Sequence, residues 1–131
     1  MQGIKWGRSA TFALLLVVAS TLFAGQAAAQ SQLLEVYSAF LGSADHFNSK
    51  GSRLTQPWQI IRQDRANFHK FGIRDPGDEG DRYFASAANR GRMERMILNG
   101  TIERTAANRI VNSNVWITVE IYNDFVNVTV Q

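Results

Sequence analysis

Residues 114–131 read NVWITVEIYNDFVNVTVQ, and this stretch decides the fold. Apolar residues occupy every second position on both sides of a central Asn-Asp pair, which is typical of two half-buried strands. A two-residue turn at this pair would place Tyr122 opposite Phe125 and Ile121 opposite Val126. The pattern therefore predicts a C-terminal antiparallel β-hairpin.

The predicted register sorts the hairpin side chains into two faces. One face is wholly apolar and requires a core: Ile117, Val119, Ile121, Val126, Val128 and Val130. The other face mixes aromatic and polar side chains: Trp116, Thr118, Glu120, Tyr122, Phe125, Asn127 and Thr129. A lone hairpin is marginal in water, so helices must pack on the apolar face, or a third strand or a partner chain must extend the sheet.

Trp116, Tyr122 and Phe125 are the best candidates for a binding site in this chain. Exposed aromatic side chains with polar neighbours are typical of recognition surfaces. The alternative is that a neighbouring element covers these rings and makes them a second core layer. The pattern does not identify the ligand, which we expect to be a protein or a small molecule.

The region before the hairpin predicts several short helices. In residues 32–41, QLLEVYSAFL, four apolar side chains have helical spacing: Leu33, Val36, Tyr37 and Phe40. Pro57 suits the first turn of a longer helix, and Gly72 suits the stop after its last turn. Further helices are predicted on either side of breaks at residues 89–91 and 99–101.

The longer helix carries an acid on its apolar side. On a helical wheel one arc gathers Trp58, Ile60, Ile61, Phe68 and Phe71. Asp64 falls inside this arc, where a buried carboxylate needs a partner. Arg62, Arg65 or an arginine from residues 90–95 would supply it. We therefore expect Asp64 to form a structural ion pair.

The first 29 residues have the three parts of an export signal. Lys5 and Arg8 give a positive start, and residues 11–23 form an apolar segment. Ala27 and Ala29 then occupy the small-residue positions before a cleavage site. The spacing predicts cleavage after Ala29 and export to a bacterial periplasm or the culture medium.

Cleavage would leave residues 30–131 as a single small α+β domain. The alternative is an uncleaved membrane anchor, since residues 9–34 carry no charge. The 14 Lys and Arg residues fall to 12 when Lys5 and Arg8 leave, against 11 Asp and Glu, so the domain is near +1. This balance and the export signal argue against a nucleic-acid partner. We expect membrane contact only as the route of export.

Residues 73–84, IRDPGDEGDRYF, allow two interpretations. The first is a calcium-stabilised module with an irregular site formed by Asp75, Asp78, Glu79 and Asp81. The second is a turn at the Pro-Gly pair followed by an N-cap at Asp81. We expect the turn and the cap, and no cofactor, because the glycines and acids do not fit the spacing of a calcium loop.

Catalysis has only weak support in the sequence. A hydrolase of unrecognised type would use His46 or His69 with an acid. The chain has no cysteine, and it lacks both the Gly-x-Ser-x-Gly and the His-Glu-x-x-His patterns. The absence of cysteine also excludes disulfides, so the domain must rely on its core. We therefore predict a non-catalytic binding or interaction module whose oligomeric state the sequence leaves open.

Overall fold

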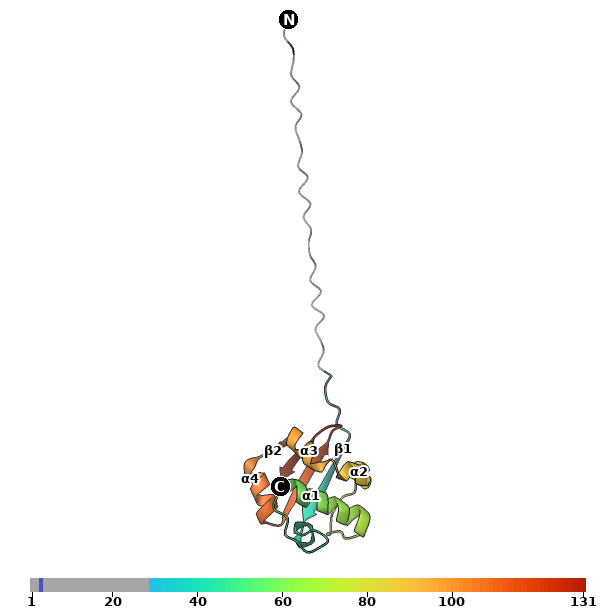
Figure 1. Cartoon of the computed structure of the whole chain (residues 1–131), viewed down its shortest axis with the longest axis vertical. Coiled ribbons are helices and arrows are strands. Elements are labelled where there is room, and N and C mark those ends of the chain that lie inside the picture. Colours follow the sequence, from blue (N-terminus) through green and yellow to red (C-terminus); the bar gives the residue numbers. More distant parts are fainter. Residues whose placement is uncertain (1–2, 4–28) are drawn as a thin grey trace.

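The chain forms an α+β domain in which helices pack on one face of a four-stranded sheet (Figure 1). The computed structural model describes residue 3 and residues 29–131. Apart from residues 3 and 29, the predicted export signal lies outside this range. The predicted fold class is confirmed, but the sheet is larger than a hairpin. Within the described residues, no helix is long and apolar enough to cross a bilayer.

The elements follow one another along the chain, with the two longest connections over residues 47–56 and 72–82. They are β1 (Glu35–Leu41), the 3-10 turn η1 (Ser43–His46), α1 (Pro57–Ala66), the π-helical turn η2 (Asn67–Phe71), the 3-10 turn η3 (Tyr83–Ala85), α2 (Ala87–Arg90), α3 (Met93–Asn99), β2 (Thr101–Ile102), α4 (Arg104–Asn112), β3 (Val115–Ile121) and β4 (Val126–Val130). The strand order is β1-β3-β4-β2. Only the β2–β4 pair is parallel.

The C-terminal hairpin has the predicted register. The Tyr122 amide donates to the Phe125 carbonyl over 2.9 Å, and Ile121 lies opposite Val126. Along both strands the side chains of the predicted apolar face point into the core, and all of them but the half-buried Val130 are fully or almost fully buried. Turn geometry and side-chain alternation specify the same pairing, which explains why the sequence predicted it.

The predicted helix over residues 32–41 is wrong, because this segment forms strand β1. It pairs with β3 along its whole length, from Glu35 opposite Ile121 onward. The buried side chains alternate as Tyr37, Ala39 and Leu41, whereas Val36 points outward and is 50% exposed. Pairing satisfies the free backbone groups along one edge of β3, and this tertiary gain outweighs the helical spacing of the apolar residues.

The longer helix begins at Pro57 as predicted and ends at Gly72, whose φ of 67° gives a left-handed stop. Its last turn, residues 67–71, is wider than an α-helical turn, and the Ile73 amide donates to the Asn67 carbonyl over 2.8 Å. Phe68 stays buried, but Phe71 turns outward and is 46% exposed. The predicted place of Phe71 on the apolar arc is therefore wrong, because the wider turn shifts the helical phase.

The core lies between the helices and the inner face of the sheet. It brings together buried side chains of α1 (Ile60, Ile61), α3 (Met93, Met96, Ile97) and α4 (Ile110) with those of the strands. The predicted break near residues 89–91 is present as the junction of α2 and α3. The second predicted break contains the two-residue strand β2, so α4 begins only at Arg104.

Candidate functional site

The outer face of the sheet carries the three aromatic residues that the sequence singled out. All three are half-buried. Trp116 packs on Phe40 with 5.5 Å between ring centroids. Tyr122 stacks on Phe125, with centroids 4.4 Å apart and an angle of 12° between the rings. Tyr122 directly follows β3 and is six residues from Trp116, which corresponds to about 20 Å of extended chain. The face therefore has two separate aromatic ends.

Polar side chains fill the strip between the two aromatic ends. The Ser38 and Thr118 hydroxyls lie 3.2 Å apart across β1 and β3. The Gln131 amide nitrogen donates to the Thr118 hydroxyl over 2.7 Å, and the Asn127 amide donates to the Glu120 carboxylate over 3.4 Å. These bonds run across the strands and hold the polar side chains in fixed positions. The outer face of β1, β3 and β4, with both aromatic ends and this strip, is called the outer sheet face below.

The acidic segment forms the predicted turn and cap. The Asp78 amide donates to the Asp75 carbonyl over 3.1 Å, and Gly77 has a φ of 86°, which a turn with glycine at its third position requires. The Asp81 carboxylate accepts from the Phe84 amide at the start of η3. Both features of the second interpretation are therefore confirmed.

The same segment closes the free edge of the sheet. The Glu79 carboxylate accepts from the Ser38 amide over 2.7 Å, and the Asp78 carboxylate accepts from the Phe40 amide over 2.8 Å. The Glu79 amide in turn donates to the Ser38 carbonyl over 2.9 Å. Side chains and backbone thus occupy the Ser38 amide, the Ser38 carbonyl and the Phe40 amide, which β1 would otherwise offer to another strand.

The four acids proposed as calcium ligands contact different parts of the protein. Asp78 and Glu79 bind β1, Asp81 binds the end of α1, and Asp75 lies against Gly42. Within the described residues, no group of three or more His, Cys, Asp or Glu side chains is arranged to hold a metal ion. The calcium interpretation stays a prediction.

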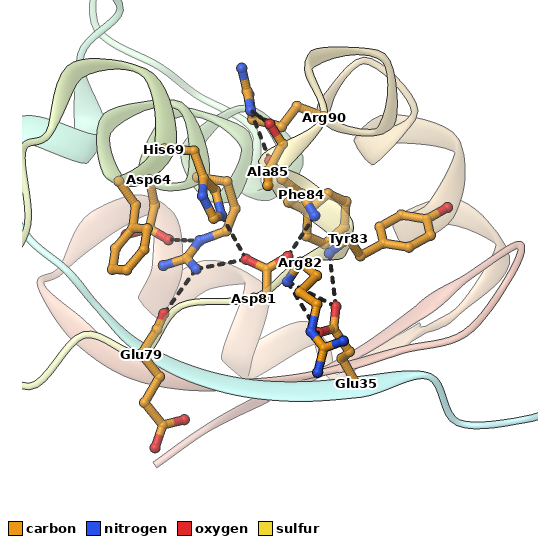
Figure 2. Close-up of polar contacts among 12 residues, drawn as sticks. Glu35, Asp64, His69, Glu79, Asp81, Arg82, Tyr83, Phe84, Ala85 and Arg90 are labelled. Carbon is orange, nitrogen blue, oxygen red and sulfur yellow. Dashed lines mark hydrogen bonds and ion pairs between the residues drawn. The ribbon is translucent and has the colours of Figure 1, made fainter.

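Asp64, His69 and Asp81 belong to one network of charged side chains (Figure 2), and the buried Arg65 lies at its centre. Its Nε donates to Asp64 Oδ2 over 2.7 Å, and its Nη1 donates to Asp81 Oδ1 over 3.0 Å. The guanidinium lies between two aromatic rings, 4.0 Å from the Tyr37 centroid and 4.7 Å from that of Phe68. The predicted ion pair of Asp64 is confirmed, with Arg65 as the partner.

Two buried carboxyl groups have raised pKa values. Burial raises the pKa of Asp64 to about 7, although the neighbouring Arg65 guanidinium opposes this shift. Arg65 also binds the fully buried Asp81, so one positive charge is shared between two carboxylates. Burial likewise raises the pKa of Asp45 to about 6, against hydrogen bonds from Asn67 and from the Gly42 amide. Desolvation disfavours the charged form in both cases.

The candidate histidine His46 contacts two backbone carbonyls inside the fold. His46 is buried, and its ring nitrogens lie 2.8 Å from the Gly42 carbonyl and 2.9 Å from the Ile110 carbonyl. A carbonyl only accepts, so a ring with hydrogens on both nitrogens is the form that satisfies both contacts. Arg53 donates to the Val111 carbonyl over 2.8 Å. His46 and Arg53 therefore bind the C-terminal end of α4, where donors are favourable.

His69 pairs with an acid that the sequence did not assign to it. Its Nε2 lies 2.9 Å from Asp81 Oδ1, an oxygen that also accepts from Arg65 (Figure 2). His69 and Asp81 are 12 positions apart, and the chain between them includes most of the acidic segment, so no local spacing indicates the contact. The nearest sequence signal is the acid-rich composition of residues 75–81.

Comparisons with protein-family models, with curated protein sequences and with solved structures find no match for this chain.

Proposed function

We propose that this chain is an exported, non-catalytic binding domain that recognises a partner through the outer sheet face. One observation carries the proposal: within the described residues the helices pack on one side of the sheet, and the other side holds half-buried aromatic rings at the two ends of a polar strip. Gly77 of the acidic turn lies against the Trp116 ring. The solvated face of a sheet is normally polar, so aromatic rings gathered on it are typical of a recognition surface.

The outer sheet face has the chemistry of a recognition surface. Tyr and Trp side chains supply large contact areas at low conformational cost and dominate the affinity of many interfaces. Trp116 is held by Phe40, and Tyr122 is held by Phe125. Because the rings and the polar strip already have fixed positions, binding would lose little side-chain entropy.

The closed sheet edge supports recognition by the face. A partner that adds a strand needs free amides and carbonyls at an edge. Glu79 and Asp78 occupy the Ser38 and Phe40 amides along the edge of β1 that does not pair with β3. A ligand on this side of the domain would therefore use the side chains of the face.

The contacts of the histidines support a non-catalytic function. A general base needs a free nitrogen within reach of a substrate proton. His46 uses both ring nitrogens in contacts to backbone carbonyls. His69 shares its acid partner with Arg65 in a buried network.

Export is the second part of the proposal and rests on the sequence of residues 1–29. N-terminal sequencing and intact mass of the exported protein test it, and we expect Gln30 as the first residue. A protein that retains Met1 and the apolar segment would contradict processing and favour a membrane anchor.

The binding proposal is tested by the double variant Trp116→Ser and Tyr122→Ser. Both rings are half-buried, so we expect the melting temperature to stay within a few degrees of the wild type. Capture of partners from periplasmic extract should fall strongly. Leu98→Ser is the control, because this exposed leucine lies on α3, away from the outer sheet face. A double variant that unfolds would make the rings a second core layer and remove the proposed site.

A further inference from the structure

A second candidate surface lies between the loop after η1 and the end of the long helix. Three large apolar side chains there are exposed: Phe47 by 41%, Phe71 by 46% and Ile73 by 52%. They line one hollow of about 300 Å³ together with Ala44, Asn48, Ser49, Gln63 and Asn67. This hollow is called the Phe71 groove below.

The wide helical turn builds one wall of the groove. Residues 67–71 form a π-helical turn, and the left-handed Gly72 follows it. This turn directs Phe71 and Ile73 away from the core, although Phe68 in the same turn is buried. Single π-helical turns cost stability and are frequent at functional sites. The turn therefore places two apolar side chains at the surface where an ordinary helix end would bury one of them.

Buried hydrogen bonds fix one side of the groove. The Gln63 amide nitrogen donates to the Asn67 side-chain oxygen over 2.9 Å, and the Asn67 amide donates to Asp45 over 2.9 Å. Asn67 and Asp45 are both buried. The groove is thus largely formed before any ligand binds, as small binding sites usually are.

The charge around the groove is positive. The two segments that form the groove, residues 44–53 and 67–74, carry one acid, the buried Asp45, and four exposed cations: Lys50, Arg53, Lys70 and Arg74. Arg53 also donates to the Val111 carbonyl, and Arg74 stacks on Phe68 at 4.0 Å. Two of the cations stack on groove walls, with Arg53 5.5 Å from the Phe47 centroid and Lys70 5.1 Å from the Phe71 centroid. One further acid, Asp75, lies against Gly42 before η1.

We infer that the Phe71 groove binds a peptide segment in which a bulky apolar residue is flanked by Asp or Glu. The apolar residue fills the hollow between Phe47, Phe71 and Ile73, and the acids meet the surrounding Lys and Arg side chains. A hollow favours an inserted side chain over a lipid surface, because membrane-binding residues project outward to reach the acyl chains. This site is separate from the outer sheet face, so the two proposals stand independently.

Selection from a phage-displayed library of random peptides on the immobilised full chain tests the inference. Enriched peptides should combine an aromatic or aliphatic residue with nearby acids. Higher salt should weaken their binding to the protein. The double variant Phe71→Ser and Ile73→Ser should lower the affinity of the selected peptides about tenfold or more. Lys70→Glu should lower it too, and Leu98→Ser should leave it unchanged.

Several outcomes would overturn the inference. They are the enrichment of no peptide, the enrichment of peptides without acids, and binding that the groove variants leave intact. The melting temperature of each variant is measured as well, because loss of binding counts only in a folded protein. Adsorption to phosphatidylglycerol vesicles that depends on Phe71, with no peptide enriched, would assign the surface to a membrane instead.

Discussion

Replacing Asp64 with asparagine should make the stability of the domain less dependent on pH. Asp64 is buried beside Arg65, and Arg65 also serves the buried Asp81. Burial raises the pKa of Asp64 from 3.8 to about 7. The fold therefore favours protonated Asp64, and asparagine imitates that neutral form while keeping an oxygen for Arg65 Nε.

The sign and size of the effect follow from the raised pKa. A carboxyl with a raised pKa in the fold contributes stability that is complete below about 3.8 and is lost as the pH rises through about 7. As the pH rises from 5 to 8, ionisation of Asp64 should lower the free energy of unfolding of the wild type by about 2–3 kcal/mol. Asp45, with a pKa of about 6, should cost about 1 kcal/mol more in the same range.

Urea unfolding followed by circular dichroism across this pH range measures the difference. The stability of Asp64→Asn relative to the wild type should increase by about 2–3 kcal/mol from pH 5 to pH 8. Asp124→Asn is the control, because this carboxylate is 82% exposed at the hairpin turn, and it should leave the pH profile unchanged. Two results would show that the fold requires the charged carboxylate. The first is a stability of Asp64→Asn that falls with pH as steeply as that of the wild type. The second is a free energy of unfolding at pH 8 that is clearly lower for Asp64→Asn than for the wild type.

Three further predictions concern the core, the acidic turn and calcium. Val119→Asp places an unpaired charge in the buried middle of β3 and should unfold the domain by circular dichroism, whereas Thr118→Asp on the outer sheet face should not. Gly77→Ala should cost about 1–3 kcal/mol in urea, because φ is 86° and the added carbon would lie 2.9 Å from Trp116. Gly51→Ala, with a similar φ of 82° and open space around it, should cost less, and an equal cost would refute the contact with Trp116. Calorimetry should give the same melting temperature with calcium as with EDTA, and a higher melting temperature with calcium would support the metal interpretation.

The sequence predicted the hairpin correctly because two independent signals agreed. The Asn-Asp turn and the alternation of apolar side chains specify one register, and a slip by one residue would expose Val119 and its neighbours. The need of Asp64 for an arginine partner was also predictable, although the sequence left Arg62, Arg65 and residues 90–95 open and the structure shows Arg65. These features depend on residues that are close in sequence.

The sequence could not predict features that depend on distant contacts. In β1, Val36 and Phe40 on the outer side and Tyr37 on the inner side happen to have helical spacing, and only pairing with β3 decides between helix and strand. In the sequence Asp78 and Glu79 resemble ion ligands, whereas in the fold their carboxylates accept from backbone amides of β1. The packing of Phe40 on Trp116 also appears only with the third strand in place.

The central claim is that ligands bind the outer sheet face, and the indole N–H signals of two tryptophans test it directly. Trp116 lies on that face, whereas Trp58 lies on α1 beneath Arg62, whose guanidinium is 4.8 Å from its ring. A partner captured from periplasmic extract is added to the ¹⁵N-labelled protein while both signals are followed. We predict that the Trp116 signal shifts and the Trp58 signal stays in place. A shift of Trp58 with Trp116 unchanged would contradict the claim.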